Sequence, residues 1–283
     1  MIPMNGGLIR LRELYETLSP SEHKIAAYIL QNPDEMIQLS IADLATKSGS
    51  SQAAIVRLCK SIGFKGYQDL KIKVAGDLQG RDPAIIGYQE IRPNDTISAI
   101  MQNVSNNNIQ SIRDTLTILD EAMVERAVEA IDRAKVIYFF GVGASNLIAM
   151  DAQQKFLRIN KMSFSFADPH VQLTSAITAT ADDVAVCISY SGETKEVIRA
   201  ASIVKDNGGT VISIAKYGNS TLSRSADIPL CTSATENEIR SGAMASRITQ
   251  LNLIDILYLA VASRNYEQSV TYLEKSRQHI KRL

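Results

Sequence analysis

Between residues 136 and 231, short apolar runs alternate with stretches of helical periodicity. The runs have the length and the boundaries of buried strands, and the stretches between them have the spacing of amphipathic helices. The predicted strands are Val136–Phe140, Ser163–Phe166, Val184–Ile188, Thr210–Ala215 and Ile228–Cys231. Strands that alternate with helices predict an α/β fold, with a parallel sheet covered on both faces.

Helical periodicity alone marks the first 78 residues. Residues 79–94 are rich in Pro, Gly and charge, which predicts a linker. Further helices are predicted over residues 95–117, 120–133, 243–263 and 267–281. The predicted domains are therefore a helical domain over 1–78 and an α/β domain over 95–283, each long enough to bury a core of its own.

Composition narrows the class of protein. No apolar run approaches the roughly 20 residues that a membrane-spanning helix needs. The N-terminus lacks the basic start and apolar core of a signal peptide, so a cytoplasmic protein without membrane contact is expected. The three cysteines and three histidines are scattered without metal-ligand spacing, so neither a metal nor a cofactor is expected.

A turn rich in hydroxyls, Ser189–Thr194 (SYSGET), follows the predicted strand Val184–Ile188. Helical periodicity resumes after Thr194, so the turn is expected at a helix N-terminus, where free N–H groups and the helix dipole favour an anion. The Ser and Thr hydroxyls add donors, and Gly192 permits close approach of the backbone. The turn holds no Lys or Arg. It therefore predicts a neutral cradle for the phosphate of a small molecule.

A second turn, Gly141–Asn146 (GVGASN), follows the first predicted strand. It is similar to the start of a dinucleotide-binding fingerprint, but Asn146 stands where the third Gly belongs, and no acidic residue closes the next strand. A nicotinamide cofactor is therefore not expected, and alone the turn fits an ordinary strand-to-helix connection. Parallel strands end at one edge of their sheet, however, so Gly143, Ser145 and Asn146 would join the hydroxyls of the other turn around a phosphorylated ligand.

Residues 40–62 predict two short amphipathic helices joined by a glycine-containing turn, which fits either a helix-turn-helix or a compact helical bundle. The charge distribution favours DNA. The whole chain is neutral, but its charge is unevenly distributed. Residues 47–80 carry six Lys and Arg against two Asp, a net charge of +4 that favours binding to a polyanion. Residues 1–46 carry three Lys and Arg against six Asp and Glu, a net charge of −3. The candidate DNA-binding residues are Ser50, Ser51, Gln52, Arg57, Lys60 and Lys65.

The two hydroxyl-rich turns, within about residues 107–263, resemble those of the sugar isomerase (SIS) domain, a phosphosugar-binding fold. Residues 1–77 resemble the helix-turn-helix domain of the RpiR family of bacterial transcription regulators. The segments that carry this second resemblance are Ser19–Glu22, Ala26–Ile29, Ile41–Ala45, Ile55–Leu58 and Gly63–Leu70. The segment Glu236–Arg247 is also similar to the part of that family before the closing helix. Both halves of the chain thus resemble one family.

The resemblance implies an all-helical domain that binds operator DNA, followed by an αβα parallel-sheet SIS domain that binds a sugar phosphate and so modulates operator binding. By the same similarity, Ser189, Ser191 and Thr194 hold the phosphate, and Ser145 and Glu236 meet the sugar. MurR-type members of the family point to an amino-sugar 6-phosphate, of N-acetylmuramic acid or N-acetylglucosamine, with a pentose or hexose phosphate as the alternative. The regulated genes would serve carbohydrate or amino-sugar catabolism. A homodimer or homotetramer is expected, because operators usually match the two-fold symmetry of their proteins.

The alternative function is a sugar-phosphate isomerase or etherase with an appended helical domain. Isomerisation needs a positioned base, and similarity to SIS enzymes implies a Glu on the predicted helix over 145–159. That helix carries only Asp151, about one turn too early, and Arg158 near the expected position. Glu236, Glu193 and Asp168 remain candidate bases. Sensing without turnover, and so no enzyme, is the favoured interpretation.

Overall fold

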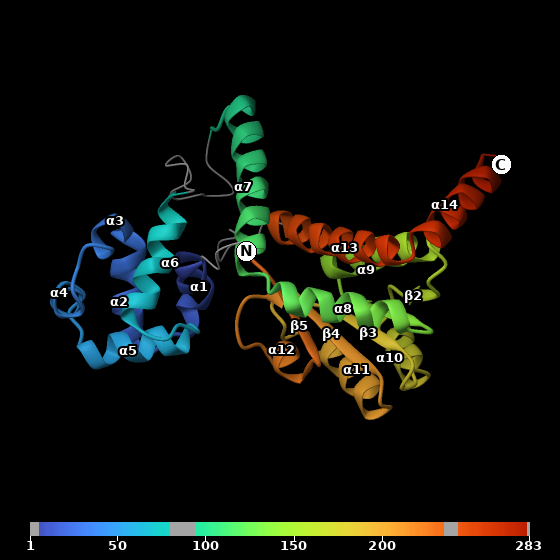
Figure 1. Cartoon of the computed structure of the whole chain (residues 1–283), viewed down its shortest axis with the longest axis horizontal. Helices are drawn as coiled ribbons and strands as arrows, with labels where there is room; N and C mark the ends of the chain where they lie inside the picture. Colours follow the sequence, from blue (N-terminus) through green and yellow to red (C-terminus); the bar gives the residue numbers. More distant parts are fainter. Residues whose placement is uncertain (1–5, 80–93, 235–242, 282–283) are drawn as a thin grey trace. The chain divides into compact units, whose positions relative to one another are not determined.

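Figure 1 shows the computed structural model of the chain, which describes residues 6–79, 94–234 and 243–281. The chain divides into two compact units. The first contains the N-terminal helices and residues 116–118, and the second contains the other described residues from 94 onward. The predicted linker lies outside the described residues except at its two ends. No helix in the described ranges is both long enough and apolar enough to cross a membrane.

The first unit is all-helical, as its periodicity predicts. Its elements are α1 (Gly7–Leu14), the 3-10 helix η1 (Tyr15–Thr17), α2 (Pro20–Gln31), α3 (Pro33–Met36), α4 (Ile41–Lys47), α5 (Gln52–Ser61) and α6 (Tyr67–Gln79). Capping boxes begin α2 at Ser19 and α4 at Ser40. Helix α2 ends at Gln31, and Pro33 then begins the one-turn helix α3.

One apolar core joins these helices. Its members come from every helix of the unit and include six fully buried side chains: Leu11, Ile25, Ile29, Leu44, Ile55 and Leu58. The buried face of α5 packs on α2 and α4. Its opposite face is therefore left for solvent or a partner.

The second unit has the predicted alternation of strands and helices. Its elements are α7 (Ile97–Ile118, shared at its end with the first unit), α8 (Glu121–Arg133), β1 (Ile137–Gly141), α9 (Ala144–Arg158), β2 (Ser163–Ser165), α10 (Pro169–Ile177), β3 (Val184–Ile188), α11 (Lys195–Asp206), β4 (Thr210–Lys216), α12 (Thr221–Ser225), β5 (Ile228–Thr232), α13 (Met244–Arg264) and α14 (Tyr266–Ile280). The five strands form one parallel sheet in the order β2-β1-β3-β4-β5.

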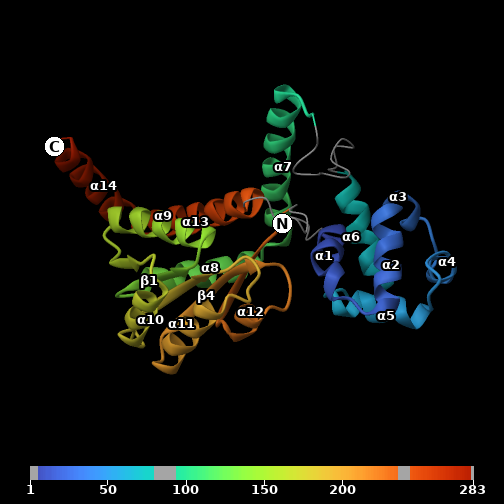
Figure 2. The same ribbon diagram turned by 180° about the vertical axis from the view of Figure 1, so that it is seen from behind.

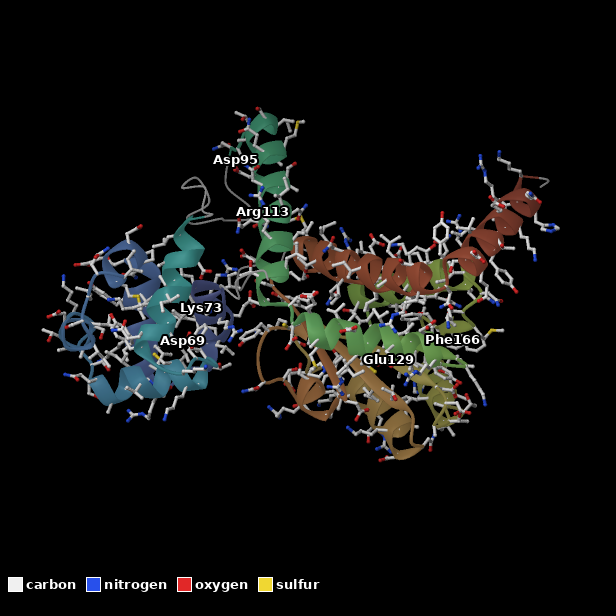
Figure 3. The ribbon with its side chains drawn as sticks, in the orientation of Figure 1. Asp69, Lys73, Asp95, Arg113, Glu129 and Phe166 are labelled. Atoms are coloured by element: carbon white, nitrogen blue, oxygen red, sulfur yellow. The ribbon has the colours of Figure 1, made fainter. Side chains whose placement is uncertain are left out.

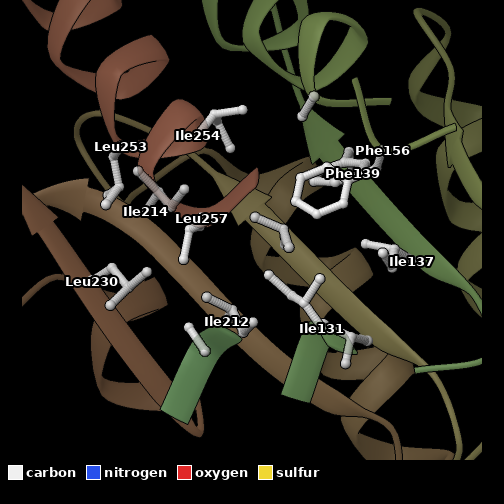
Figure 4. Close-up of a cluster of buried hydrophobic side chains, with 14 of the residues drawn as sticks. Ile131, Ile137, Phe139, Phe156, Ile212, Ile214, Leu230, Leu253, Ile254 and Leu257 are labelled. Atoms are coloured by element: carbon white, nitrogen blue, oxygen red, sulfur yellow. The ribbon is translucent and has the colours of Figure 1, made fainter. Parts of the chain in front are cut away.

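Alternate side chains of the sheet enter two separate cores, which makes the unit a three-layer αβα structure. On one face, residues such as Phe139, Ile212 and Ile214 pack against α8, α9 and α13 (Figure 4). On the other face, Phe140 and Cys187 pack against α10, α11 and α12. The two groups of helices are seen on opposite sides of the strands in Figure 2. Both faces of the sheet are thus covered, and the edge where the strands end is left to carry a ligand.

Candidate functional site

The chain order places the two hydroxyl-rich turns next to each other. From β1 the chain moves to β2 on one side and returns to β3 on the other, so the sheet has its topological switch point between β1 and β3. Gly141 at the end of β1 pairs with Ile188 at the end of β3. The turns Gly141–Asn146 and Ser189–Thr194 therefore leave neighbouring strands at the carboxyl edge of the sheet. In open α/β sheets ligands bind at this place.

The turn after β3 is organised by its own hydroxyls. Ser189 is buried, and its Oγ lies 2.8 Å from Thr194 Oγ1 and accepts a hydrogen bond from Gly192 N at 3.1 Å. Ser191 is exposed, and its Oγ accepts from Glu193 N at 3.2 Å. Thr194 is the N-cap of α11 without a side-chain bond to its first turn, so the first N–H groups of α11 keep their capacity for an anion.

A contact with α12 holds this turn in place. Gly192 has a φ of +68°, and a Cβ added there would lie 2.1 Å from Ser220 Oγ and 2.4 Å from Ser220 Cβ. Leu222 N donates to Gly192 O at 3.0 Å, and Thr221 N donates to Glu193 Oε1 at 2.8 Å. The bond from the Thr221 backbone, assisted by the Thr221 side chain, lowers the pKa of Glu193. Ser220 was not a predicted site residue. It lies 28 residues from Gly192 in the sequence, and no local pattern indicates that the two residues are in contact.

The turn after β1 needs glycine at two positions. A Cβ on Gly141 would lie 2.6 Å from Ser145 O, and Gly143 has φ 60° and ψ −124°, a backbone conformation that other residues rarely adopt. Gln172 of α10, 2% exposed, holds the turn by donating from Nε2 to Gly141 O at 2.8 Å and to Phe166 O at 2.7 Å. Gln172 is not a predicted site residue, since nothing in the sequence indicates which carbonyl groups a polar residue of a helix will contact.

The remaining predicted residues of this turn open α9. Ser145 is half-buried in the first turn of the helix. Asn146 is 7% exposed, and its Oδ1 has no hydrogen-bond partner among the described residues. Glu236, the predicted sugar contact, lies outside the described residues.

The two other candidate bases, and the misplaced Asp151, have structural partners. Asp168 caps α10, and its Oδ1 accepts from His170 N at 2.8 Å and Val171 N at 3.1 Å. Glu193 is bonded to the start of α12. Asp151 forms an ion pair with Lys155 at 2.6 Å. These three carboxylates are thus occupied in holding the fold.

The predicted helix-turn-helix consists of α4, a four-residue turn and α5. Gly49 has a φ of +61° just after α4, and Ser50 N donates to Ala45 O at 2.9 Å, which closes the turn. Ser51 is the N-cap of α5, with its Oγ accepting from Ala54 N at 3.2 Å. Gln52, Arg57 and Lys60 lie on the exposed face of α5.

The basic block contains two kinds of cation. Lys47 is ion-paired with Glu35, and Lys71 Nζ donates to Leu39 O at 2.9 Å. The hydrogen bond from Lys47, with another from Tyr28, lowers the pKa of Glu35. By contrast, Arg57, Lys60 and Lys65 are exposed, and the described residues give none of them an ion pair.

Asp69 of α6 bonds the loop that carries Lys65. Figure 3 labels Lys73 on α6 with Asp69, whose Oδ2 accepts from Lys65 N at 2.9 Å. The loop between α5 and α6 is thereby fixed while the Lys65 side chain stays exposed. Because Lys47 and Lys71 are engaged within the unit, the positive charge available to a polyanion is smaller than the net charge of the block indicates.

Comparison with known proteins finds matches in both units. Residues 5–81 match the helix-turn-helix domain of the rpiR family, and residues 130–260 match the SIS domain. The chain is 41% identical over 273 residues to the uncharacterized HTH-type transcriptional regulator YbbH of Bacillus subtilis, and the match covers 96% of each chain. It is 34% identical to the HTH-type transcriptional regulator HexR of Pseudomonas aeruginosa over 92% of this chain and 90% of that protein.

A solved structure is similar over nearly the same length. The NanR protein of Vibrio vulnificus, complexed with ManNAc-6P, is 29% identical and covers 97% of both chains with a TM-score of 0.61.

Proposed function

The chain belongs to the RpiR family of helix-turn-helix transcriptional regulators and has a SIS domain, and we propose which of its residues bind the effector and the DNA. The effector phosphate binds the turn Ser189–Thr194, and the sugar lies toward the turn Gly141–Asn146. The exposed face of α5 enters the major groove of operator DNA with Gln52, Arg57 and Lys60 as its contacts, joined by Ser51 before the helix and Lys65 after it. The Oγ of Ser50, the remaining predicted contact, is buried, so Ser50 is not among the proposed contacts. Binding of the effector changes the affinity for the operator.

The observation that carries this proposal is the meeting of the two turns at the switch point of the sheet. Ser189 and Thr194 bring two hydroxyls within 2.8 Å of each other at the start of α11. An anion there would meet hydroxyl donors and the free N–H groups of a helix. A relative 29% identical over 97% of the chain was solved with ManNAc-6P. That complex supports a hexosamine 6-phosphate as the effector, and thus control of amino-sugar catabolism in the cytoplasm.

A thermal-shift screen of sugar phosphates tests the effector part of the proposal. A ligand that binds only the folded chain raises the melting temperature in proportion to the logarithm of its concentration above Kd. N-acetylmannosamine 6-phosphate should give the largest shift in a panel with the 6-phosphates of N-acetylglucosamine, N-acetylmuramic acid and glucose. If no member raises the melting temperature, the effector part of the proposal is wrong.

We further propose that the effector is sensed without turnover. Two of the three candidate bases, Asp168 and Glu193, are bonded to the protein itself, as is Asp151 on α9. A positioned base is required for isomerisation. A coupled assay of each sugar phosphate with the full chain should therefore detect no multiple turnover. Turnover that disappears in Glu236→Gln would instead support the isomerase alternative.

Replacing Ser191 with alanine should weaken effector binding about 10- to 100-fold, because a hydrogen bond to a charged group contributes about 1.5–3 kcal/mol. Ser191 Oγ is exposed at the turn and free to rotate its proton toward a phosphate oxygen. Isothermal titration calorimetry measures the loss. Ser202→Ala, on the body of α11, is the matched control and should leave the affinity unchanged; equal affinities for both variants would contradict the assignment.

We propose that the regulator is a symmetric oligomer, in which a second copy covers the exposed apolar side of α7. Ile97 and Met101 lie on one face of this 22-residue helix and are 72% and 66% exposed. An isolated helix is only marginally stable in water and needs packing of its apolar face.

The double variant Ile97→Asp/Met101→Asp should therefore have a lower molar mass in light scattering than the natural chain. Ile72→Asp, which removes an equally exposed isoleucine from α6, serves as the control and should keep the natural mass. An unchanged mass of the double variant would exclude this face as the interface.

A further inference from the structure

The buried stripe of α13 changes its chemistry along the helix. From Leu253 to Val261 the buried residues are all apolar and belong to the core on one face of the sheet. Over the first two turns of the helix, three of the four buried residues are polar: Ser246, Thr249 and Gln250 are 1%, 0% and 2% exposed, and the fourth is Ala245. Thr249 Oγ1 donates to Ser246 O at 3.0 Å, so its hydroxyl is satisfied within the helix. The buried amide of Gln250 needs a separate explanation.

The polar end of α13 lies toward the carboxyl edge of the sheet. Lys155 of α9 is ion-paired with Asp255 of α13, and the rings of Phe156 and Tyr258 are 5.8 Å apart. Asn265, just after α13, donates from Nδ2 to Asp132 Oδ1 at 2.6 Å, near the end of α8 and just before β1, so α13 ends at the amino edge of the sheet. Because α9 also ends at that edge, the two helices run in the same direction. Because α9 begins at the carboxyl edge, directly after β1, the start of α13 lies at that edge too. The pairing of Lys155 with Asp255 and of Phe156 with Tyr258 gives the register of the two helices. In this register Gln250 lies about one helical turn from the level of Asn146.

Two side chains in this region have a buried polar atom without a partner. Within the described residues, neither Gln250 Nε2 nor Asn146 Oδ1 has a hydrogen bond, although the two residues are 2% and 7% exposed. Native proteins seldom leave such atoms unpaired, and an exception calls for an explanation such as an absent ligand. One atom is a donor and the other an acceptor, which is the pair that a sugar hydroxyl or an acetamido group requires.

Gln172 shows what a structural glutamine does in the same domain. It is also 2% exposed, but its Nε2 donates to two carbonyl oxygens, Gly141 O and Phe166 O. Gln250 Nε2 has no such hydrogen bond among the described residues. A purely structural role therefore accounts for Gln172 and leaves Gln250 unexplained.

We infer that Gln250 and Asn146 are the residues that recognise the sugar part of the effector. Gln250 Nε2 donates to an oxygen of the sugar, and Asn146 Oδ1 accepts from a hydroxyl or amide N–H of the same ligand. The turn Ser189–Thr194 holds the phosphate, and this amide pair selects what is attached to it. The inference rests on the proposed binding of a sugar phosphate at the switch point.

Gln250→Met in the full chain tests the inference, because methionine keeps the length of the side chain and removes the amide. Calorimetry with N-acetylmannosamine 6-phosphate, and with the other panel members, should show affinity reduced at least tenfold. Protection against heat by inorganic phosphate, which probes the anion cradle alone, should be unchanged. The melting temperature of the ligand-free variant should equal or exceed the natural value, whereas Gln172→Met, which loses two hydrogen bonds, should lower it.

The possible results separate the two levels of the proposal. If the natural chain binds no sugar phosphate of the panel, the proposed effector and the inference built on it both fail. If the natural chain binds one and Gln250→Met binds it equally well, the effector stands and the inference alone is wrong. A lower melting temperature of ligand-free Gln250→Met, with sugar-phosphate and inorganic-phosphate binding weakened alike, would also overturn it by showing a structural role.

Discussion

Replacing Gly192 with alanine should abolish the response of DNA binding to the effector, with a loss of effector affinity of at least about 100-fold, or roughly 3 kcal/mol. The added Cβ would lie 2.1 Å from Ser220 Oγ and 2.4 Å from Ser220 Cβ. Ser220 cannot turn away freely, because its Oγ caps α12 by accepting from Ser223 N at 3.2 Å. The turn Ser189–Thr194 must move instead, and its hydroxyls then lose their common arrangement.

Gly208→Ala is the matched control for this substitution. Gly208 also has a positive φ, +84°, but its added Cβ would make an ordinary contact of 3.5 Å with Ala181 Cβ, after the end of α11. It should lose about 1–2 kcal/mol of stability from backbone strain alone and keep its effector affinity. Calorimetry with the best ligand of the panel compares the variants. Effector affinity retained in Gly192→Ala would show that this turn does not bind the phosphate.

Removing the two exposed cations of α5 should produce the other large effect. The double variant Arg57→Ala/Lys60→Ala should bind operator DNA about 10- to 1,000-fold more weakly, and the slope of log K against log salt should fall by about 2, since each lost phosphate contact contributes about 0.9. Effector affinity should not change, because both residues belong to the first unit. Fluorescence anisotropy over a range of salt concentrations measures both quantities.

Lys47→Ala/Lys71→Ala is the control for net charge. It removes the same two charges, but Lys47 is paired with Glu35 and Lys71 is bonded to Leu39 O. DNA affinity should fall no more than about threefold through long-range electrostatics. An equal loss of DNA affinity in the two double variants would mean that net charge alone drives DNA binding, without specific contacts from the exposed face of α5.

Much of the fold was predictable because its signals are local. The strand Val184–Ile188 has the predicted bounds. A strand buried on both faces must be apolar throughout, and Asp182 and Asp183 mark where this apolar run begins. The caps at Ser19 and Ser40 likewise mark helix starts in the sequence. Helix α3 was missed because one turn is too short for a period to be recognised.

The candidate site was predictable only where it is contiguous in the chain. Both turns are visible as short segments, and the parallel sheet then brings them together. Ser220 and Gln172 come from distant helices, and their contacts with the turns leave no pattern in the sequence. The same holds for the buried Nε2 of Gln250, for which we propose a role in sugar recognition. Charge counting had the same weakness, because the sequence does not show that Lys47 and Lys71 are engaged within their own unit.

The most direct test of the account is an operator-binding titration of the full chain with and without effector. The DNA is a fluorescent duplex selected by the full chain from random sequence, and the effectors are the sugar phosphates of the panel. At least one sugar phosphate should shift the Kd for this duplex by about fivefold or more, and Ser191→Ala should remove the shift without changing the Kd measured in its absence. Identical binding curves with every sugar phosphate would contradict the account.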